Sequence, residues 1–430
     1  MARKSEKISD TVAYTNARLL DPANGIDAPG GVLTDGEQIA AAGADLFEKG
    51  IPDGAEVVDC GGHCLAPGLV DMRVELGSLS ASGRAAASGG ITSMVCLPNT
   101  NPVIDNEAVL ELVARRARKL GLAKIYAYGA ITDGLGGTEM AELASLAKSG
   151  AVAFTDGTRT IADAQMMRMA LSYGSTFDLL IVNHPEEPSL AKDGVMNDGE
   201  TATRLGLPGI PIEAEVIMVE RDIRLADLTG GRLHIAHVST SAAVEAIRQA
   251  KARGINITCD TAPPYFALNE TAVGDYRTFA KLSPPLRGEH DRQAIVGGLK
   301  DGTIDVVASD HAPRDEESKR QPFAEAAAGG VGLNTLLAIS LELYHNGFLG
   351  ILDVMRLLTQ APADLMNLPA GRLETGWPAD LVLFDPDHGW QVTEDALLSQ
   401  AKNSPFDSRP VQGIVLRTVV DGRTVHQLEK

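Results

Sequence analysis

Four side chains able to bind a metal ion or move a proton are Asp156, His184, His237 and Asp310. Imidazole and carboxylate groups suit zinc or a similar divalent ion. Such an ion would lower the pKa of a bound water molecule and polarise a carbonyl group. Asp310 would then carry a proton between that water and a leaving amine. Taken singly, each residue could equally be a strand-end polar group bonded to backbone, but together they indicate a working or ancestral metal site.

The elements that must position these residues alternate between strand and helix. Predicted strands cover residues 68–75, 92–97, 124–130, 151–155, 177–183, 232–238, 256–259 and 304–309. Predicted helices rich in Ala, Leu, Arg and Glu follow, for example at 106–119, 139–148, 162–173, 212–228, 241–253 and 291–299. This alternation over about 250 residues favours a (β/α)8 barrel over a doubly wound open sheet.

In such a barrel the functional groups gather at the carboxyl ends of the strands. Side chains alternate along a strand, so Asp71, Arg73 and Glu75 share one face. His234 and His237 are an odd number of residues apart and should face opposite ways. We therefore expect only His237, at the strand end, to enter the barrel.

Both ends of the chain have short apolar runs separated by Gly, Pro and Asp, which are typical of strands. An Asp421-Gly422 pair near the end predicts a hairpin turn. We expect residues 1–66 and 371–430 to share one small β-sandwich domain, and residues 67–370 to form the barrel.

Composition excludes several classes of partner. The chain has 430 residues and a formal net charge of −19, with no basic stripe that would favour nucleic acid. No apolar run approaches the about 18 residues of a membrane span. The N-terminus is polar, and four cysteines in this length form no disulfide framework. These features predict a reduced, cytoplasmic protein without a nucleic-acid or membrane partner.

Several motifs resemble dihydroorotases of the amidohydrolase superfamily, class I type. They are residues 183–184 (NH), 234–240 (HIAHVST), 281–287 (KLSPPLR), 308–313 (ASDHAP) and 98–105 (PNTNPVID). The flanks at 66–71 (APGLVD) and 371–381 (GRLETGWPADL) fit as well, so the resemblance covers nearly the whole chain. It implies the reversible closure of carbamoyl-aspartate to dihydroorotate in pyrimidine synthesis, by way of a zinc-bound hydroxide. Asn99 matches a substrate contact of the family.

The first barrel strand departs from the family pattern. The family has Asp-x-His-x-His-x-Arg there, whereas this chain has Asp71-x-Arg73-x-Glu75-x-Gly77. The connection at residues 77–85 is several residues shorter than in the family. Ser283 stands in place of an asparagine, and Arg314 stands in place of a histidine.

These departures suggest that Arg73 substitutes for the metal. A guanidinium is a permanent cation that cannot ligate an ion, but it can neutralise Asp156 and Asp310, with Glu75 as its other partner. The metal set Asp156, His184, His237 and Asp310 would then be vestigial, with no tightly bound cofactor. The alternative is that Arg73 turns to solvent beside a degraded site.

The resemblance leaves three functions open. The first is a catalytically impaired dihydroorotase homologue that acts as a structural partner of aspartate carbamoyltransferase or of itself, as some family members without metal ligands do. The second is an active zinc enzyme, a dihydroorotase or another cyclic amide hydrolase, with a single-metal site and Asp310 as its catalytic group. The third is a protein that binds a pyrimidine intermediate through Asn99 and Arg314.

Overall fold

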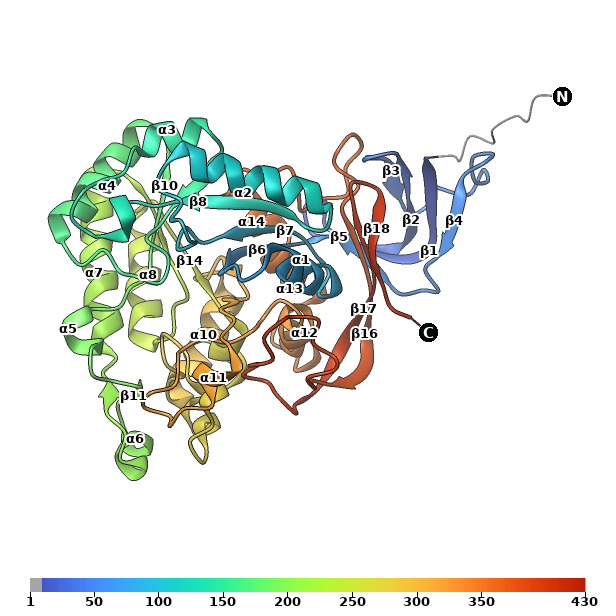
Figure 1. Cartoon of the computed structure of the whole chain (residues 1–430). Coiled ribbons are helices and arrows are strands. Elements are labelled where there is room, and N and C mark those ends of the chain that lie inside the picture. The colour runs from blue at the N-terminus through green and yellow to red at the C-terminus, as the bar shows by residue number, and fades with distance from the viewer. Residues whose placement is uncertain (1–9, 430) are drawn as a thin grey trace.

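The computed structural model describes residues 10–429, and its main body is a parallel barrel (Figure 1). The strands are β6 (Leu69–Val74), β7 (Ile91–Cys96), β8 (Lys124–Gly129), β9 (Ala151–Phe154), β10 (Leu180–Asn183), β13 (Arg232–Ile235), β14 (Ile257–Thr261) and β15 (Val306–Val307). They pair in chain order from β6 to β15. A parallel bridge between Val74 and His311 connects the last strand segment to the first. This arrangement confirms the predicted (β/α)8 barrel.

Helices surround the barrel (Figure 1). They are α1 (Leu79–Ser88), α2 (Glu107–Leu120), α3 (Leu143–Lys148), α4 (Ala164–Thr176), α7 (Glu213–Thr229), α8 (Ser241–Ala252), α10 (Glu289–Asp301), α12 (Leu336–His345), α13 (Ile351–Leu358) and α14 (Gln360–Leu365). The residues at the helix ends determine where the helices start and stop, as α2 shows. The Asn106 side chain accepts the backbone N–H of Val109 at the start of α2, and Gly121 adopts the left-handed conformation at its end.

The barrel interior is filled by side chains that alternate with outward ones along each strand. Val70, Met72, Tyr128 and Val182 belong to the inner cluster, whereas Ile181 packs outward with the helices. Residues of α14 and the following turn, among them Ala363 and Met366, join the inner cluster. The barrel is therefore a packed core, and only its carboxyl rim is open to chemistry.

Smaller elements extend that rim. They are η1 (Asp133–Leu135), α5 (Pro188–Ala191), β11 (Met196–Asn197), α6 (Glu200–Leu205), β12 (Gly209–Ile210), α9 (Pro263–Ala267), η2 (Glu270–Val273), η3 (Thr278–Ala280) and α11 (Glu316–Lys319). Residues 315–320 form a charged run in the sequence, and Lys319, at the end of α11 within this run, is buried.

The two chain ends meet in one β domain beside the barrel (Figure 1). Its strands are β1 (Thr11–Asp21), β2 (Ile26–Asp35), β3 (Gln38–Gly43), β4 (Glu56–Asp59), β5 (Cys64–Pro67), β16 (Leu381–Gln391), β17 (Pro410–Val420) and β18 (Arg423–Gln427). They form one hydrogen-bonded sheet in the order β18-β17-β16-β5-β1-β2-β3, with β4 beside β1. The joining of the two ends is as predicted.

A single residue, Gly68, separates β5 of this sheet from β6 of the barrel. A Cβ atom at Gly68 would lie 2.1 Å from the side chain of Thr92, so only glycine fits at this junction. Gly68 also donates its N–H to the carbonyl of Asp380 at 2.9 Å. The first barrel strand is thus fixed directly to the β domain.

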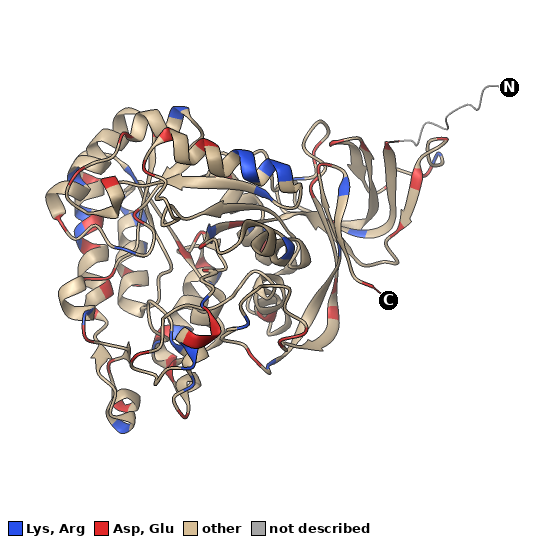
Figure 2. Cartoon of the chain, viewed as in Figure 1, with Lys and Arg blue, Asp and Glu red and all other residues tan. Residues whose placement is uncertain are grey.

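Residues of both charge signs are mixed over the helices, with Lys and Arg gathered on the second half of α2 (Figure 2). No helix within residues 10–429 is long and apolar enough to cross a membrane. Cys60, Cys64, Cys96 and Cys259 are free thiols buried in the core.

Candidate active site at the carboxyl rim

An ion pair between Arg73 and Asp310 lies at the centre of the rim. Arg73, in β6, donates from Nε to Oδ1 of Asp310 at 3.0 Å, and its Nη2 donates to the carbonyl of Gly157 at 3.2 Å. The Arg73 side chain is only 3% exposed and that of Asp310 is 20% exposed. The guanidinium therefore points into the barrel mouth and not to solvent.

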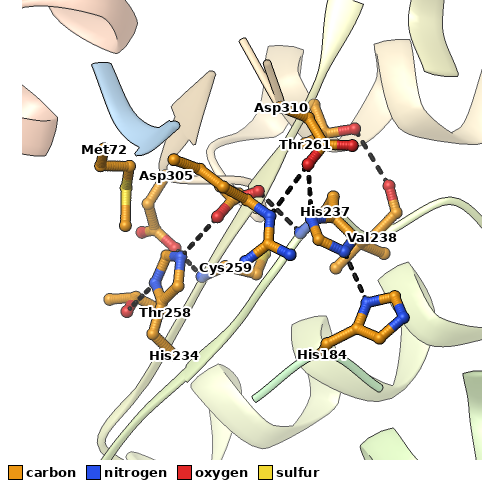
Figure 3. A network of polar contacts seen from close by, with 12 residues as sticks. Met72, His184, His234, His237, Val238, Thr258, Cys259, Thr261, Asp305 and Asp310 are labelled. Atoms are coloured by element: carbon orange, nitrogen blue, oxygen red, sulfur yellow. Dashed lines mark hydrogen bonds and ion pairs between the residues drawn. The ribbon is translucent and has the colours of Figure 1, made fainter. Parts of the chain in front are cut away.

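Next to this pair, His184 and His237 face one another (Figure 3). Nδ1 of His184 and Nε2 of His237 are 2.6 Å apart, so one ring donates a hydrogen bond to the other. Burial first, and the positive charge of Arg73 second, lower the pKa of His184 to about 3. The same causes lower the pKa of His237 well below its usual value. Both rings are consequently neutral at pH 7.

The other nitrogen of His237 turns toward Asp310. Nδ1 of His237 is buried without a hydrogen-bond partner and lies 3.7 Å from Oδ1 of Asp310. Burial raises the pKa of Asp310 to about 7, against the opposing effect of Arg73. A carboxyl group with a pKa near neutrality suits proton transfer. His184, His237 and Asp310, three members of the predicted set, therefore do meet at the rim.

The fourth member, Asp156, does not join them through any described interaction. Its Oδ1 accepts the N–H groups of Ile131 and Thr132 at 2.9 and 3.0 Å, and its Oδ2 accepts the Thr132 hydroxyl. Burial nevertheless raises its pKa. The expectation that Arg73 neutralises Asp156 is wrong, because the adjacent turn after β8 already satisfies this carboxylate. Thr132 itself gave no signal in the sequence beyond its place after a predicted strand.

Glu75 was expected to be a second partner of Arg73, and this is also wrong. Glu75 accepts two hydrogen bonds from Arg314, at 2.5 Å from Nη1 and 3.1 Å from Nη2. The cause is barrel closure: the N–H of Glu75 donates to the carbonyl of His311 at 2.8 Å, so Arg314 lies nearby. Arg314, predicted to contact substrate, is thereby paired within the protein.

Asn99 stands close to the same rim. A Cβ atom at Gly157 would lie 3.6 Å from Cγ of Asn99, and Gly157 is the residue whose carbonyl accepts from Arg73. Asn99 as a whole is partly exposed.

The expectation that His234 faces away from the barrel is wrong as well. Its neighbours Leu233 and Ile235 pack outward with the helices, and His234 lies between them on the inward face. Its Nδ1 is 2.8 Å from the Thr258 hydroxyl, and its Nε2 is 2.9 Å from Oδ2 of Asp260.

His237 also contacts Asp260, but through its backbone N–H group. The strand ends at Ile235, and His237 has a φ of +35°, so the simple alternation no longer applies. Its N–H donates to Oδ1 of Asp260 at 2.6 Å. Asp310 likewise has a φ of +49°. Non-glycine residues in this region of φ are often found at functional sites.

Asp71 holds the backbone on both sides of the Arg73–Asp310 pair. Its Oδ1 accepts the N–H of Ser309 at 3.0 Å and that of Arg73 at 3.2 Å, so one carboxylate joins the first strand to the segment after the eighth. Its Oδ2 is buried without a partner, and burial raises its pKa to about 6. Sequence reasoning placed Asp71 on the face of Arg73 but gave it no role.

The donor groups do not fit a zinc ion in this arrangement. The imidazoles of His184 and His237 are hydrogen-bonded to one another, and Asp310 accepts a hydrogen bond from the guanidinium of Arg73. Asp156 already accepts three hydrogen bonds. Within residues 10–429, no group of three or more His, Cys, Asp or Glu side chains is placed to hold a metal ion. The cation among these residues is that of Arg73.

Solved structures with the same architecture include hydantoinases and dihydropyrimidinases. An L-hydantoinase (dihydropyrimidinase) from Arthrobacter aurescens superposes with a TM-score of 0.85 at 25% identity, covering 97% of this chain and 96% of that one. A dihydropyrimidinase from Brevibacillus agri shares the fold at a TM-score of 0.83 and 23% identity. The closed barrel, its rim of histidine and aspartate, and the appended β domain define a protein of the amidohydrolase type.

Sequence comparison narrows this class. The family model described as dihydro-orotase-like matches residues 62–243. A dihydroorotase from Syntrophotalea carbinolica is 45% identical over 425 residues, which cover 97% of this chain and 99% of the relative. One from Anaplasma phagocytophilum is 43% identical over 433 residues, covering 97% and 96%. The chain belongs to the dihydroorotase family.

Proposed function

We propose that this chain serves pyrimidine biosynthesis as a dihydroorotase homologue with impaired turnover, and that it acts as a structural partner of aspartate carbamoyltransferase. The proposal rests on one observation: the buried guanidinium of Arg73 bonds Asp310 at 3.0 Å among the residues that would otherwise hold zinc. In this proposal Arg73 supplies the positive charge of the ion but cannot activate water.

The first experiment measures zinc and activity in the same preparation. Purified chain is analysed for bound metal and assayed for opening of dihydroorotate and closure of carbamoyl-aspartate, with and without added zinc. We expect less than one zinc per chain and no turnover above background. Tightly held stoichiometric zinc with robust turnover would overturn the proposal of impairment.

A designed variant tests the role of Arg73 directly. The double substitution Arg73→His with Glu75→His restores the His-x-His spacing of the family at the carboxyl end of β6. We expect this variant to gain zinc affinity at least tenfold over the parent, because two neutral imidazoles replace a cation and a paired carboxylate. Glu75→His alone is the control, since it leaves the Arg73 cation in place and should not gain zinc.

The partner is tested by co-expression with the aspartate carbamoyltransferase of the same organism. A tagged chain should retain the transferase through size-exclusion chromatography, and the complex should show higher transferase stability than the transferase alone. Separate elution at micromolar concentrations of both chains would contradict the partnership and leave self-association to be measured by light scattering.

A second function is favoured by a specific observation. His184, His237 and Asp310 remain adjacent, and burial places the pKa of Asp310 at about 7. A dihydroorotase or other cyclic amide hydrolase with an altered zinc site would use these groups. Turnover that requires Asp310 and rises with added zinc would support this function over the first one.

A further inference from the structure

A cavity of about 620 Å³ lies outside the Arg73–Asp310 pair, between α1, α11 and the segment before β17. Its volume lies within the range of small-molecule sites. The lining side chains that matter here are Ser78, His311, Arg314, Lys319 and Lys402. We refer to it as the α1 cavity.

The amino end of α1 opens into this cavity. Ser78 caps the helix in an extended conformation, but its side chain accepts no backbone N–H, and the first turn has no acidic residue. The first N–H groups of an α-helix have no partner within the helix and carry partial positive charge. Ser78 and Ala81 line the cavity, so this end of the helix is available to an anion.

Two lysines of the cavity wall have backbone carbonyls as partners and no carboxylate among the described ion pairs. Nζ of Lys319 donates to the carbonyls of Thr278 at 3.0 Å and Lys281 at 3.3 Å, with the residue only 3% exposed. Nζ of Lys402 donates to the carbonyls of Glu394 and Leu397. Burial, followed by the positive charges of Arg314 and Lys281, lowers the pKa of Lys319 to about 7.

The carboxylates on the same wall do not offset these lysines. Asp315 caps α11 by accepting the N–H of Ser318, and Glu316 pairs with Arg320. Glu394 is exposed. A buried cation without an acid partner is costly, and an anion in the cavity would offset that cost.

His311 is a second, independent indication of an anion site, because one of its ring nitrogens has a hydrogen to donate and no described partner. The residue is 2% exposed, and its Nδ1 accepts the N–H of Gly332 at 3.2 Å. The neutral ring therefore carries its proton on Nε2. No described residue accepts a hydrogen bond from Nε2, and the ring lines the cavity.

We propose that the α1 cavity binds a small organic anion whose carboxylate or phosphate group lies at the amino end of α1, between Lys319 and His311. Helix N–H groups, one imidazole N–H and a buried ammonium provide donors around a single acceptor. This proposal does not rest on the proposed function, because it involves neither metal binding nor turnover.

The test uses the full chain and two probes, inorganic phosphate and succinate, measured by isothermal titration calorimetry at low ionic strength. We expect at least one probe to bind saturably and to raise Tm, because a ligand of the folded state stabilises it. Binding should weaken as salt is added. Binding of phosphate alone identifies a phosphate ligand, binding of succinate alone a carboxylate ligand, and binding of both the shared anion chemistry.

Two test variants and one control variant make the test specific. Lys319→Met should reduce affinity at least tenfold, whereas Lys300→Met, an exposed lysine at the end of α10, should not change it. Ser78→Asp places a carboxylate at the cap, so it should reduce affinity tenfold while raising Tm, which separates lost binding from lost folding. No saturable binding of either probe, or equal affinity in Ser78→Asp and parent, overturns the proposal.

Discussion

Arg73 lies in the first barrel strand, and Asp310 follows the eighth strand, 237 positions later in the chain. The two side chains form a hydrogen-bonded ion pair across the barrel mouth. β15 has only two residues, so few backbone hydrogen bonds can join the eighth strand to its neighbours. The ion pair adds a side-chain connection between the first strand and the segment after the eighth. Its position and its charge together make Arg73 a structural element of the rim.

The Arg73–Asp310 pair should contribute strongly to stability. Arg73→Met leaves Asp310 without its cation, and breaking a buried pair in this way costs about 3–5 kcal/mol. Urea unfolding should be measured for Arg73→Met, Asp310→Asn and the double variant. The double variant should lose less free energy of unfolding than the two single variants lose together. The Glu316–Arg320 pair on α11, with side chains 71% and 74% exposed, is the surface control and should couple by about 1 kcal/mol or less. Simple additivity for Arg73 and Asp310 would contradict this prediction.

Removal of metal should leave the fold unchanged. Because the described donors form no cluster able to hold an ion, dialysis against a chelator should shift Tm by less than the scatter between replicates. The Arg73→His, Glu75→His variant loaded with zinc provides the positive control, since its Tm should fall on chelation. A large drop in Tm for the parent chain would show that the rim rearranges around an ion.

Asp71 should make stability depend on pH. Its folded pKa of about 6 exceeds the unfolded value of about 3.9, so the folded chain binds more protons between these two values. Its contribution to stability is therefore fully present below about pH 4 and is lost as pH rises to about 6. Asp71→Asn keeps an oxygen for the N–H groups of Ser309 and Arg73 but does not titrate, so its free energy of unfolding relative to the parent should rise by about 2 kcal/mol between pH 4 and pH 7.

The measurement for Asp71 is chemical unfolding at intervals from pH 4 to 8. The parent should lose stability across the lower half of that range relative to Asp71→Asn. Asp45→Asn, at an exposed turn, is the control and should follow the parent. Parallel curves for parent and Asp71→Asn would refute the prediction.

Thr132 should be required to hold Asp156. Thr132→Val removes the hydroxyl donor to Asp156 and the acceptor of the Gly137 N–H at 2.9 Å, leaving buried polar groups unsatisfied. We expect a loss of about 2 kcal/mol in the free energy of unfolding. Thr132→Ser keeps the hydroxyl and should lose much less, so equal losses for the two variants would argue that packing alone matters.

Strand and helix positions could be predicted from the sequence because hydrophobic periodicity and Gly, Pro and Asp breaks are local signals. The sequence predicted strands at 124–130 and 151–155, and β8 and β9 lie there. The convergence of His184, His237 and Asp310 also followed from strand-end placement alone.

Side-chain partners were less predictable because they depend on closure and on backbone irregularity. Arg314 meets Glu75 only once the eighth segment lies against the first. The positive φ of His237 allows both it and His234 to contact Asp260, which strict alternation forbids. The burial of Lys319, within a charged run of the sequence, depends on contacts with segments distant in the chain, so no local signal indicates it.

The strand order of the β domain has a consequence for synthesis on the ribosome. β5 pairs on one edge with β1 and on the other with β16, whose first residue lies more than 300 positions later in the chain. The nascent chain must therefore keep the edge of β5 unpaired while the whole barrel is translated, and chaperones have that interval in which to shield it.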